Sequence, residues 1–521
     1  MKVLFTTQSE SLRLFDALRN SLEGKLSLTQ AGFTVADSMA YLRWLETEPD
    51  FEKKGHVLLK EWELTANPSD KPDLVKLAQY ENELGTDAGL FGAIVADRRL
   101  FMGPDCTYSQ DYRRRFTDDE LLCILQRGLE QVEKLFDTLK PDMVVSFICV
   151  TMLEYLAYLF AKARGIRFFN LRPTRIGDRV SFSCILNDPS PELAVNYYRI
   201  IAEQKSVFEE EARCYIKRVR EEHGRYEGVV RPSDKPALKA NTSKYSRISG
   251  VSCAIRNYLI YKKSLAATDN HVPDPLRTLF FTAFRNPMLA KKVKKFLSGR
   301  YVTEKDLPGF KYVFFPLHTE PEVSLLVYGR PYVNQIEIIR MLAMSLPVDM
   351  VLVVKEHPWM VGKRPLGVYR KMLNIPRVYI ADPQLDARTL ILGASLVSVV
   401  TGSVALEAAM LGKPVITFGD CPYNLLPESM VRRCDDPRRI QVIVREALSD
   451  YSNNEQALES YVSAVYETSA SVNLYSVLLG KKYVHVERVG AYADEILKLA
   501  THLFDELNTT KPTMTPGAAE W

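Results

Sequence analysis

The feature that most constrains the fold is a regular alternation of short apolar runs with segments of helical periodicity. In the first part of the chain, apolar runs of strand length occur at 2–6, 143–148 and 166–171, with helical segments between them. A second alternating unit has its apolar runs at 312–316, 350–355, 377–380, 396–400 and 414–418. Strands that alternate with helices predict parallel sheets covered on both faces. We therefore predict an α/β fold with two Rossmann-like domains that face each other across a cleft.

The chain is long enough for two such domains and their connections. Of its 521 residues, 46% are hydrophobic and 25% are charged, which are ordinary globular values, so we expect a sizeable core. We predict an N-terminal Rossmann-like domain at 1–225 and a C-terminal one at 301–485, joined by a basic, aromatic-rich helical insertion or linker at 226–300. A helix at 486–508 is expected to pack back on the N-terminal domain, and a disordered tail follows at 509–521.

Cysteine usage and hydropathy indicate a cytoplasmic protein. The eight cysteines are scattered and form no CxxC pair, so neither a zinc site nor a disulfide framework is indicated. The longest apolar stretch, 143–161, contains Glu154, whose charge would be costly inside a bilayer. We interpret it as a buried strand, a turn and a helix. The first residues lack the long apolar run that a signal peptide requires.

The first candidate site is Lys355-Glu356-His357-Pro358, at the end of a predicted buried strand. Ligands bind at the carboxyl ends of strands in open α/β sheets. Proline restrains the preceding histidine to an extended geometry, from which its imidazole could donate to a phosphate oxygen. Lys355 adds positive charge. The alternative is structural: His357 caps a neighbouring loop, and Glu356 pairs with an arginine such as Arg364.

A second candidate site is Thr401-Gly402-Ser403, between a predicted strand and a predicted helix. Ser403 or Thr401 suits the N-cap position, and Gly402 allows close approach of the backbone. The free amides and dipole of such a helix start make a site for a phosphate. Glu407, one turn into the helix, could accept hydrogen bonds from ribose hydroxyls, or it could be only a partner of the helix dipole.

A third candidate site is the loop that contains His318 and Glu322, after the first strand of the second unit. This loop is predicted at the same sheet edge as the two sites above, so either side chain could touch a donor sugar or its phosphate. Glu322 could instead cap the helix that follows it.

These motifs resemble those of bacterial capsule polysaccharide biosynthesis proteins, a group that includes the Kdo transferases of capsule assembly. The resemblance is carried by the runs YVFFPLHTEPEVS, LPVDMVLVVKEHPW and VVTGSVALEAAMLGKPVITFGDCPYN, and by Asn334-Gln335. The run RIGDR at 175–179 is similar to a further motif of these proteins. The resemblance implies a GT-B fold, with the nucleotide sugar held mainly by the second domain. GT-B enzymes need no metal, and the sequence has no convincing DxD motif.

The resemblance also implies roles for single residues. His357 and Pro358 would contact the donor phosphate, as in bacterial transferases that use CMP-sugars, and Ser403 would do the same. The helix that follows Ser403 is similar to the one that binds ribose and phosphates in UDP-sugar epimerases of this architecture, which supports Glu407 as the ribose ligand.

An inverting transferase also needs a general base for the acceptor hydroxyl, normally from the N-terminal domain. The candidates near predicted strand ends are Asp178, Glu154 and Glu10. We rank Asp178 first because Arg175 and Arg179 beside it could keep it ionised. Glu322 is a further candidate from the second domain.

The stretch from residue 231 to residue 300 is strongly basic, with fifteen Lys and Arg against three Asp. Aromatic residues interleave with the charges, which fits an interfacial helix at an anionic membrane or a site for a polyanionic acceptor. The alternative is a solvated basic face. No nucleic-acid module is present, so we expect no nucleic-acid partner. The residues assigned to the patch are Arg256, Lys262, Lys263, Lys291, Lys292, Lys294 and Lys295.

The expected function is therefore transfer of a sugar from a nucleotide-sugar donor, CMP-Kdo or a similar CMP- or UDP-sugar, to a growing capsule or surface glycan or its lipid-linked acceptor. No cofactor is expected beyond the donor, which is a substrate. Other polysaccharide-assembly proteins and the inner face of the plasma membrane are further expected partners. The alternatives are an enzyme like the UDP-sugar 2-epimerases or the CDP-glycerol phosphotransferases, and a non-catalytic assembly protein.

Overall fold

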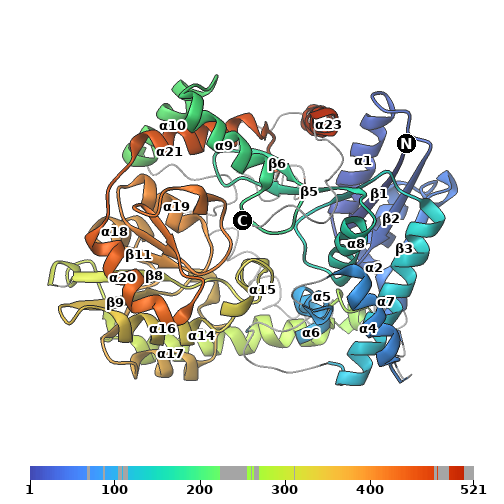
Figure 1. Ribbon diagram of the computed structural model, residues 1–521. Helices are drawn as coiled ribbons and strands as arrows, with labels where there is room; N and C mark the ends of the chain where they lie inside the picture. The colour runs from blue at the N-terminus through green and yellow to red at the C-terminus, as the bar shows by residue number, and fades with distance from the viewer. Residues whose placement is uncertain are drawn as a thin grey trace.

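The computed structural model shows an α/β molecule built on two sheets, one on each side of Figure 1. The structure describes residues 1–66, 68, 71–85, 89–103, 108, 115–222, 255–259, 261–262, 269–309, 311–474, 478 and 492–509. The predicted tail and much of the predicted insertion at 226–300 lie outside these residues.

The N-terminal sheet has seven strands in the order β14-β6-β5-β4-β1-β2-β3. Its core is parallel, with Val3 of β1 paired to Ala31 of β2 on one side and to Met143 of β4 on the other. The strands β6 and β14 add an antiparallel edge. The strands are β1 (Lys2–Thr7), β2 (Gln30–Val35), β3 (Val57–Lys60), β4 (Met143–Ser146), β5 (Arg167–Pro173), β6 (Arg179–Ser183) and β14 (Ala470–Ser471).

The C-terminal sheet also has seven strands, in the order β13-β12-β11-β8-β9-β10-β7. All its pairings are parallel. Two such sheets with helices between their strands confirm the predicted class of two Rossmann-like domains in a GT-B-like arrangement. The strands are β7 (Tyr301–Val302), β8 (Lys311–Pro316), β9 (Met350–Lys355), β10 (Val378–Ala381), β11 (Leu396–Val399), β12 (Val415–Thr417) and β13 (Val431–Arg433).

Helices cover both sheets and connect them. In the first domain they are α1 (Ser11–Glu23), α2 (Ser38–Thr47), α3 (Glu61–Leu64), α4 (Leu74–Leu84), α5 (Phe91–Ala96), α6 (Arg98–Met102), α7 (Asp118–Leu139), α8 (Met152–Ala163), α9 (Pro191–Glu203) and α10 (Glu209–Glu222). Further along the chain they are α13 (Pro275–Leu279), α14 (Asn286–Leu297), α15 (Val323–Leu326), α16 (Gln335–Ser345), α17 (Leu366–Leu373), α18 (Ala387–Gly393), α19 (Ser403–Met410), α20 (Ile440–Ser449), α21 (Glu455–Glu467) and α23 (Tyr492–Thr509). In the described part of the chain, no helix combines the length and apolar character that a membrane span requires.

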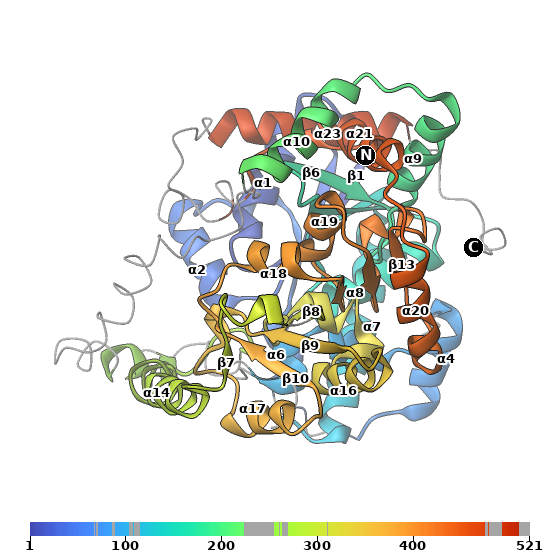
Figure 2. The same cartoon turned by 90° about the vertical axis from the view of Figure 1, so that its left-hand side faces the viewer.

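The chain crosses between the two domains along one edge, where α9, α10 and α21 lie together (Figures 1 and 2). Tyr197 and Ile216 from α9 and α10 share a buried core with Leu458 and Tyr461 of α21. The apolar face of α9 and α10 therefore packs on the C-terminal domain, although both helices lie inside the range 1–225 that we assigned to the N-terminal domain.

The return crossing follows α21. The pair β14–β6 joins Ala470 to Val180, so a segment within the range 301–485 extends the N-terminal sheet. Arg179 fastens this crossing, because its guanidinium donates to the carbonyl oxygen of Tyr466 at 2.9 Å and to the hydroxyl of Ser469 at 2.8 Å. The helix expected at 486–508 is described as α23, which lies against α1 (Figure 2).

Candidate functional site

The loop after β8 and the turn before α19 meet at the carboxyl edge of the C-terminal sheet. His318 Nε2 accepts a hydrogen bond from the backbone amide of Thr401 at 3.2 Å. Burial, followed by the positive charge of Arg175, lowers the pKa of His318 to about 3. The ring is therefore neutral, and because Nε2 is the acceptor, its hydrogen is on Nδ1.

A buried ion-pair triad fixes the same loop to the end of β9. Arg364 lies 2.7 Å from both Glu320 and Glu356, and all three side chains are at most 1% exposed. The Arg364 guanidinium also donates to the carbonyl oxygen of His318 at 3.0 Å. Tyr369 donates to Glu356 at 3.0 Å. Three donors on its carboxylate, including the His357 amide, give Glu356 the structural role that we weighed as the alternative to ligand binding.

His357 lies next to this triad and is only partly covered by its neighbours. Its Nδ1 accepts the backbone amide hydrogen of Trp359 at 3.2 Å, which caps the short helix Pro358–Met360. Partial burial and the ammonium groups of Lys355 and Lys363 lower the pKa of His357 to about 4. The neutral ring therefore keeps its hydrogen on Nε2, from which it can donate to an anion. Lys355 itself is buried at the end of β9.

The start of α19 differs from the predicted cap. Neither Ser403 nor Thr401 occupies the N-cap position; Gly402 does, and no side chain caps the helix. The Thr401 hydroxyl instead donates to the Ser324 carbonyl oxygen at 3.1 Å. Gly402 has φ 137°, and a Cβ there would lie 3.1 Å from Cε1 of His318. The turn therefore requires glycine, and it leaves the first amides of α19 without a side-chain acceptor.

Glu407 lies one turn further into α19. Its carboxylate is 3.8 Å from the guanidinium of Arg388 on α18, and its side chain is 29% exposed. Arg388 also donates to the Val219 carbonyl oxygen at the end of α10. Glu407 is thus partly open to a ligand at the point where α10 covers α19.

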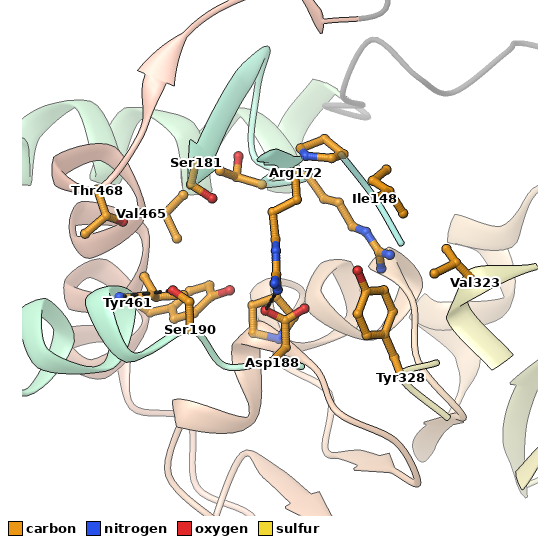
Figure 3. Close-up of a pocket in the computed structure, with 15 residues that line it drawn as sticks. Ile148, Arg172, Ser181, Asp188, Ser190, Val323, Tyr328, Tyr461, Val465 and Thr468 are labelled. Carbon is orange, nitrogen blue, oxygen red and sulfur yellow. Dashed lines mark hydrogen bonds and ion pairs between the residues drawn. The ribbon is translucent and has the colours of Figure 1, made fainter. Parts of the chain in front are cut away.

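A pocket lies between the two domains (Figure 3). It encloses about 670 Å³ of space, counting the solvent in its open mouth. The N-terminal domain contributes Ile148, Arg172, Pro173, Thr174, Arg175, Ser181, Asp188, Ser190 and Leu193. The C-terminal side contributes Val323, Tyr328, Pro422, Tyr461, Val465 and Thr468.

Arg172 and Asp188 form the charged pair of the pocket, and Figure 3 shows Tyr328 beside them. Arg172 Nη1 lies 2.8 Å from Asp188 Oδ1, and the same guanidinium also donates to Asn170 and to backbone carbonyl oxygens at 185–187. Burial raises the pKa of Asp420, and the negative charge of Asp188 adds to this effect. Asp188 therefore lies near Asp420 and lines the pocket together with residues of the C-terminal domain.

Arg175 lies close to both the pocket and the loop after β8. It has φ 63° in the β5–β6 turn and lines the pocket. Its positive charge also lowers the pKa of His318, which places it near the loop after β8. Tyr423, next to the lining residue Pro422, donates to the Gly402 carbonyl oxygen at 2.6 Å. The interdomain pocket therefore lies near the uncapped start of α19, although neither this turn nor the loops of His318 and His357 line it.

The carboxylates predicted as bases lie elsewhere. Asp178 is exposed at the β5–β6 turn and is absent from the pocket lining, while Arg179 beside it points to Tyr466. Glu10 is exposed and 3.8 Å from Arg43. Glu322 accepts from the Thr319 hydroxyl at 2.6 Å; it occupies the N-cap position of α15, but its side chain does not cap that helix.

Glu154 is fully buried in a capping box with Thr151. Its Oε2 accepts from the amides of Val150 and Thr151 at 2.8 and 3.0 Å. Burial nonetheless raises its pKa to about 8, and Oε1 is buried without a hydrogen-bond partner. Glu154 is therefore protonated at neutral pH and is shielded from an acceptor hydroxyl.

A second buried polar group joins the N-terminal domain to the segment before α13. Glu61, Asp97 and His271 bring possible metal-ligand atoms within 4.8 Å of one another. His271 Nε2 is 3.1 Å from Glu61 Oε1, and Arg99 Nη1 is 2.9 Å from Nδ1. Since an arginine can only donate, Nδ1 accepts and Nε2 carries its hydrogen toward Glu61. A metal ion on Nε2 would have to displace that hydrogen.

Sequence reasoning did not select Arg172, Asp188 or Tyr328. Tyr328 is more than 130 residues from the other two and joins them only across the domain interface. Arg175 was noted only as a neighbour of Asp178. The run RIGDR was the available signal for this region.

No protein-family model matches the chain. Protein FixF of Sinorhizobium fredii (strain NBRC 101917 / NGR234) is 34% identical over 149 residues, which are 27% of this chain and 34% of that protein. The match thus spans about a third of the length of this curated relative. The KpsC β-Kdo 2,7 transferase of Thermosulfurimonas dismutans has a TM-score of 0.36 and 13% identity, covering 72% of this chain and 89% of that one.

Two further solved structures have lower scores. The β-Kdo 2,4 transferase of the same KpsC has a TM-score of 0.30 and 14% identity over 73% of this chain and 96% of that one. The S. aureus MnaA–UDP co-structure has a TM-score of 0.28 and 13% identity over 98% and 99%.

Proposed function

We propose that this protein is a metal-independent GT-B glycosyltransferase that takes a sugar from a nucleotide-sugar donor. The observation that carries the proposal is the carboxyl edge of the C-terminal sheet: the uncapped start of α19 and the loops of His318 and His357 lie there together, near a pocket between the domains. The sequence resemblance to capsule Kdo transferases supports CMP-Kdo as the first donor to test, with other CMP- and UDP-sugars next.

The C-terminal domain would hold the donor phosphate. The free amides at the start of α19 and its dipole attract an anion. His357 would donate from Nε2, and Lys355 would add positive charge. His318 and Gly402 would shape this site without binding the donor directly, because the His318 ring holds the turn in place. Glu407 would accept hydrogen bonds from the ribose.

The N-terminal domain would supply the general base. We assign this role to Asp188 in place of Asp178, because Asp188 is the carboxylate that lines the pocket. Arg172 holds one carboxylate oxygen of Asp188 in an ion pair at 2.8 Å, and the second oxygen would be the proton acceptor.

The reaction follows from these positions. The acceptor hydroxyl oxygen attacks the anomeric carbon while the bond from that carbon to the phosphate oxygen breaks. The hydroxyl proton passes to Asp188, and the nucleotide leaves with the bonding electron pair. Donors that already face the leaving phosphate, namely the α19 amides and His357, stabilise the charge that develops there. Such preorganised groups need no rearrangement during the reaction.

The acceptor is proposed to be a surface glycan or its lipid-linked precursor, as the resemblance implies. The enzyme alternative is a sugar-nucleotide epimerase, which would change the donor without an acceptor and without releasing nucleotide.

The test is to incubate the protein with CMP-Kdo and a panel of CMP- and UDP-sugars, with and without a capsule-type acceptor oligosaccharide. Nucleotide release that requires the acceptor supports the proposal. An epimerised donor with no nucleotide release would replace it by the epimerase. Failure of every nucleotide to raise the melting temperature would reject both.

A further inference from the structure

The segment from α13 to α14 forms a helical rod with an apolar stripe on its exposed side. The two α-helices are joined by a π-helical stretch, Phe280–Arg285. Phe280, Phe284 and Met288 are 56%, 62% and 55% exposed. Their spacing of four residues puts them on one side of the rod. Large apolar side chains grouped in this way indicate an interaction surface.

The opposite side of the rod is fixed to the C-terminal domain. Val293 and Leu297 are buried in the core that also contains strands β8 and β9. Gly362, in the loop that follows His357, fits against α14 so closely that a Cβ there would lie 2.6 Å from the Asn286 carbonyl oxygen. The helix that bears the exposed stripe is thus packed against the C-terminal domain along its other side.

The chain before the rod is fixed to the N-terminal domain. Asp269 accepts from the Ser38 amide at 2.7 Å, and His271 contacts Glu61. The rod therefore connects the two domains, and Figure 2 shows α14 at the periphery of the molecule beside α17. A surface bound to the apolar stripe would hold both domains at once.

Basic side chains continue the apolar stripe. Lys291, Lys292, Lys294 and Lys295 are exposed on α14, and Arg277 is exposed on α13. No Asp or Glu occurs from residue 275 to residue 300. The exposed face of the rod thus combines three large apolar side chains with only positive charges.

We infer that the exposed face of the α13–α14 rod docks on an anionic lipid bilayer. Phe280, Phe284 and Met288 would enter the boundary between headgroups and acyl chains, and the lysines of α14 would lie among the anionic headgroups. A soluble polyanion would satisfy the lysines alone and would leave the apolar stripe in water, so the bilayer fits the whole surface better.

The patch predicted from the sequence also included Arg256, Lys262 and Lys263, which lie before the rod. Arg256 and Lys262 are exposed, and so are Ile255, which precedes Arg256, and Leu259, which lies between the two basic residues, at 48% and 57%. Lys263 lies outside the described residues. We rest the inference on α13 and α14.

The test is co-flotation of the full-length protein with two kinds of vesicle. One kind contains phosphatidylcholine alone, and the other contains phosphatidylcholine with about 30% phosphatidylglycerol, which supplies the anionic headgroups. The variants are Phe280→Ser/Phe284→Ser/Met288→Ser and Lys291→Gln/Lys292→Gln/Lys294→Gln/Lys295→Gln. The matched control is Met344→Ser/Val348→Ser, which removes apolar side chains that are 74% and 89% exposed elsewhere. Thermal unfolding checks that every variant is folded.

The wild type and the control should bind the vesicles that contain phosphatidylglycerol at least about tenfold more tightly than they bind vesicles of phosphatidylcholine alone. Each set of rod substitutions should weaken this binding by about tenfold or more, while nucleotide-induced stabilisation persists. Wild-type protein that ignores anionic vesicles would overturn the inference. So would a serine variant that binds as the wild type does, or tighter binding to a soluble acidic polysaccharide than to vesicles. Because nucleotide binding is measured separately, failure of the docking inference and failure of the proposed function are distinguishable.

Discussion

His318 Nε2 accepts the amide hydrogen of Thr401 at 3.2 Å, and the same ring covers the space that a side chain at position 402 would need. One contact thereby joins the loop after β8 to the turn before α19. The phosphate site that we propose depends on this turn, because its shape decides where the first amides of α19 point. The loop and the turn are 83 residues apart in the chain, and the parallel pairing of β8 with β11 brings them together.

The first prediction concerns Gly402. Gly402→Ala should weaken nucleotide binding by about tenfold or more, because φ 137° strains any side chain and the new Cβ meets His318. Calorimetric titration of the nucleotide measures the loss. Gly24→Ala is the control, since Gly24 has φ −74° and open space around it. Equal affinity in both variants would show that the turn is not part of the site.

The second prediction concerns the buried triad. Arg364→Met leaves Glu320 and Glu356 buried without their shared cation, so the free energy of unfolding should fall by about 3–5 kcal/mol. Arg340→Met removes an exposed pair with Glu337 and should cost less than about 1 kcal/mol. Urea unfolding compares the two variants. If both variants lose a similar amount of unfolding free energy, the buried triad contributes no more to stability than an exposed ion pair does.

The third prediction separates two aspartates. Asp188→Asn keeps the size of the side chain but removes the proposed base, so the rate of transfer should fall by about 100-fold to 10,000-fold while nucleotide affinity persists. Asp178→Asn, at the exposed turn, should retain transfer. The reverse result would restore the choice of base that we made from the sequence.

The fourth prediction concerns the pH dependence of stability. Burial raises the pKa of Glu154 from 4.5 to about 8, so between these values the folded state holds a proton that the unfolded state has released. This proton makes the wild type lose stability as pH rises through that window, by at most about 1.4 kcal/mol per pH unit. Glu154→Gln cannot ionise, and its unfolding free energy should fall less steeply between pH 5 and pH 8.

The control for this measurement is Glu304→Gln, at an exposed position, which should follow the wild-type pH profile. If the profile of Glu154→Gln also matches that of the wild type, then Glu154 is ionised in the folded protein and could still act as a base.

The sequence predicted the second domain better than the first. Its strands are continuous apolar runs with both faces buried, so β8, β9 and β11 were recognisable, and their ends placed His318, His357 and Gly402 at one edge. In the first domain, β2 contains Gln30, Gly32 and Thr34, and β3 has only four residues, so neither has a strong apolar signal.

The interdomain part of the site could not be predicted, because it depends on packing between distant elements. Asp188 meets Tyr328 only after the domains face each other, and α9 and α10 cross to the other domain through an apolar face whose partner the sequence does not identify. Glu356 was predicted as a ligand because it follows a strand, with a pairing to an arginine such as Arg364 as the alternative. Only the three-dimensional structure shows that this pair is buried.

The central claim is that the start of α19 and His357 bind a nucleotide phosphate. Its most direct test is calorimetric titration of CMP, UDP and the matching nucleosides into the wild type and into His357→Ala. The account predicts that one nucleotide binds the wild type at least about tenfold more tightly than its nucleoside, and that His357→Ala reduces this preference. If no nucleotide binds, or if nucleotide and nucleoside bind both proteins equally, the phosphate site does not exist.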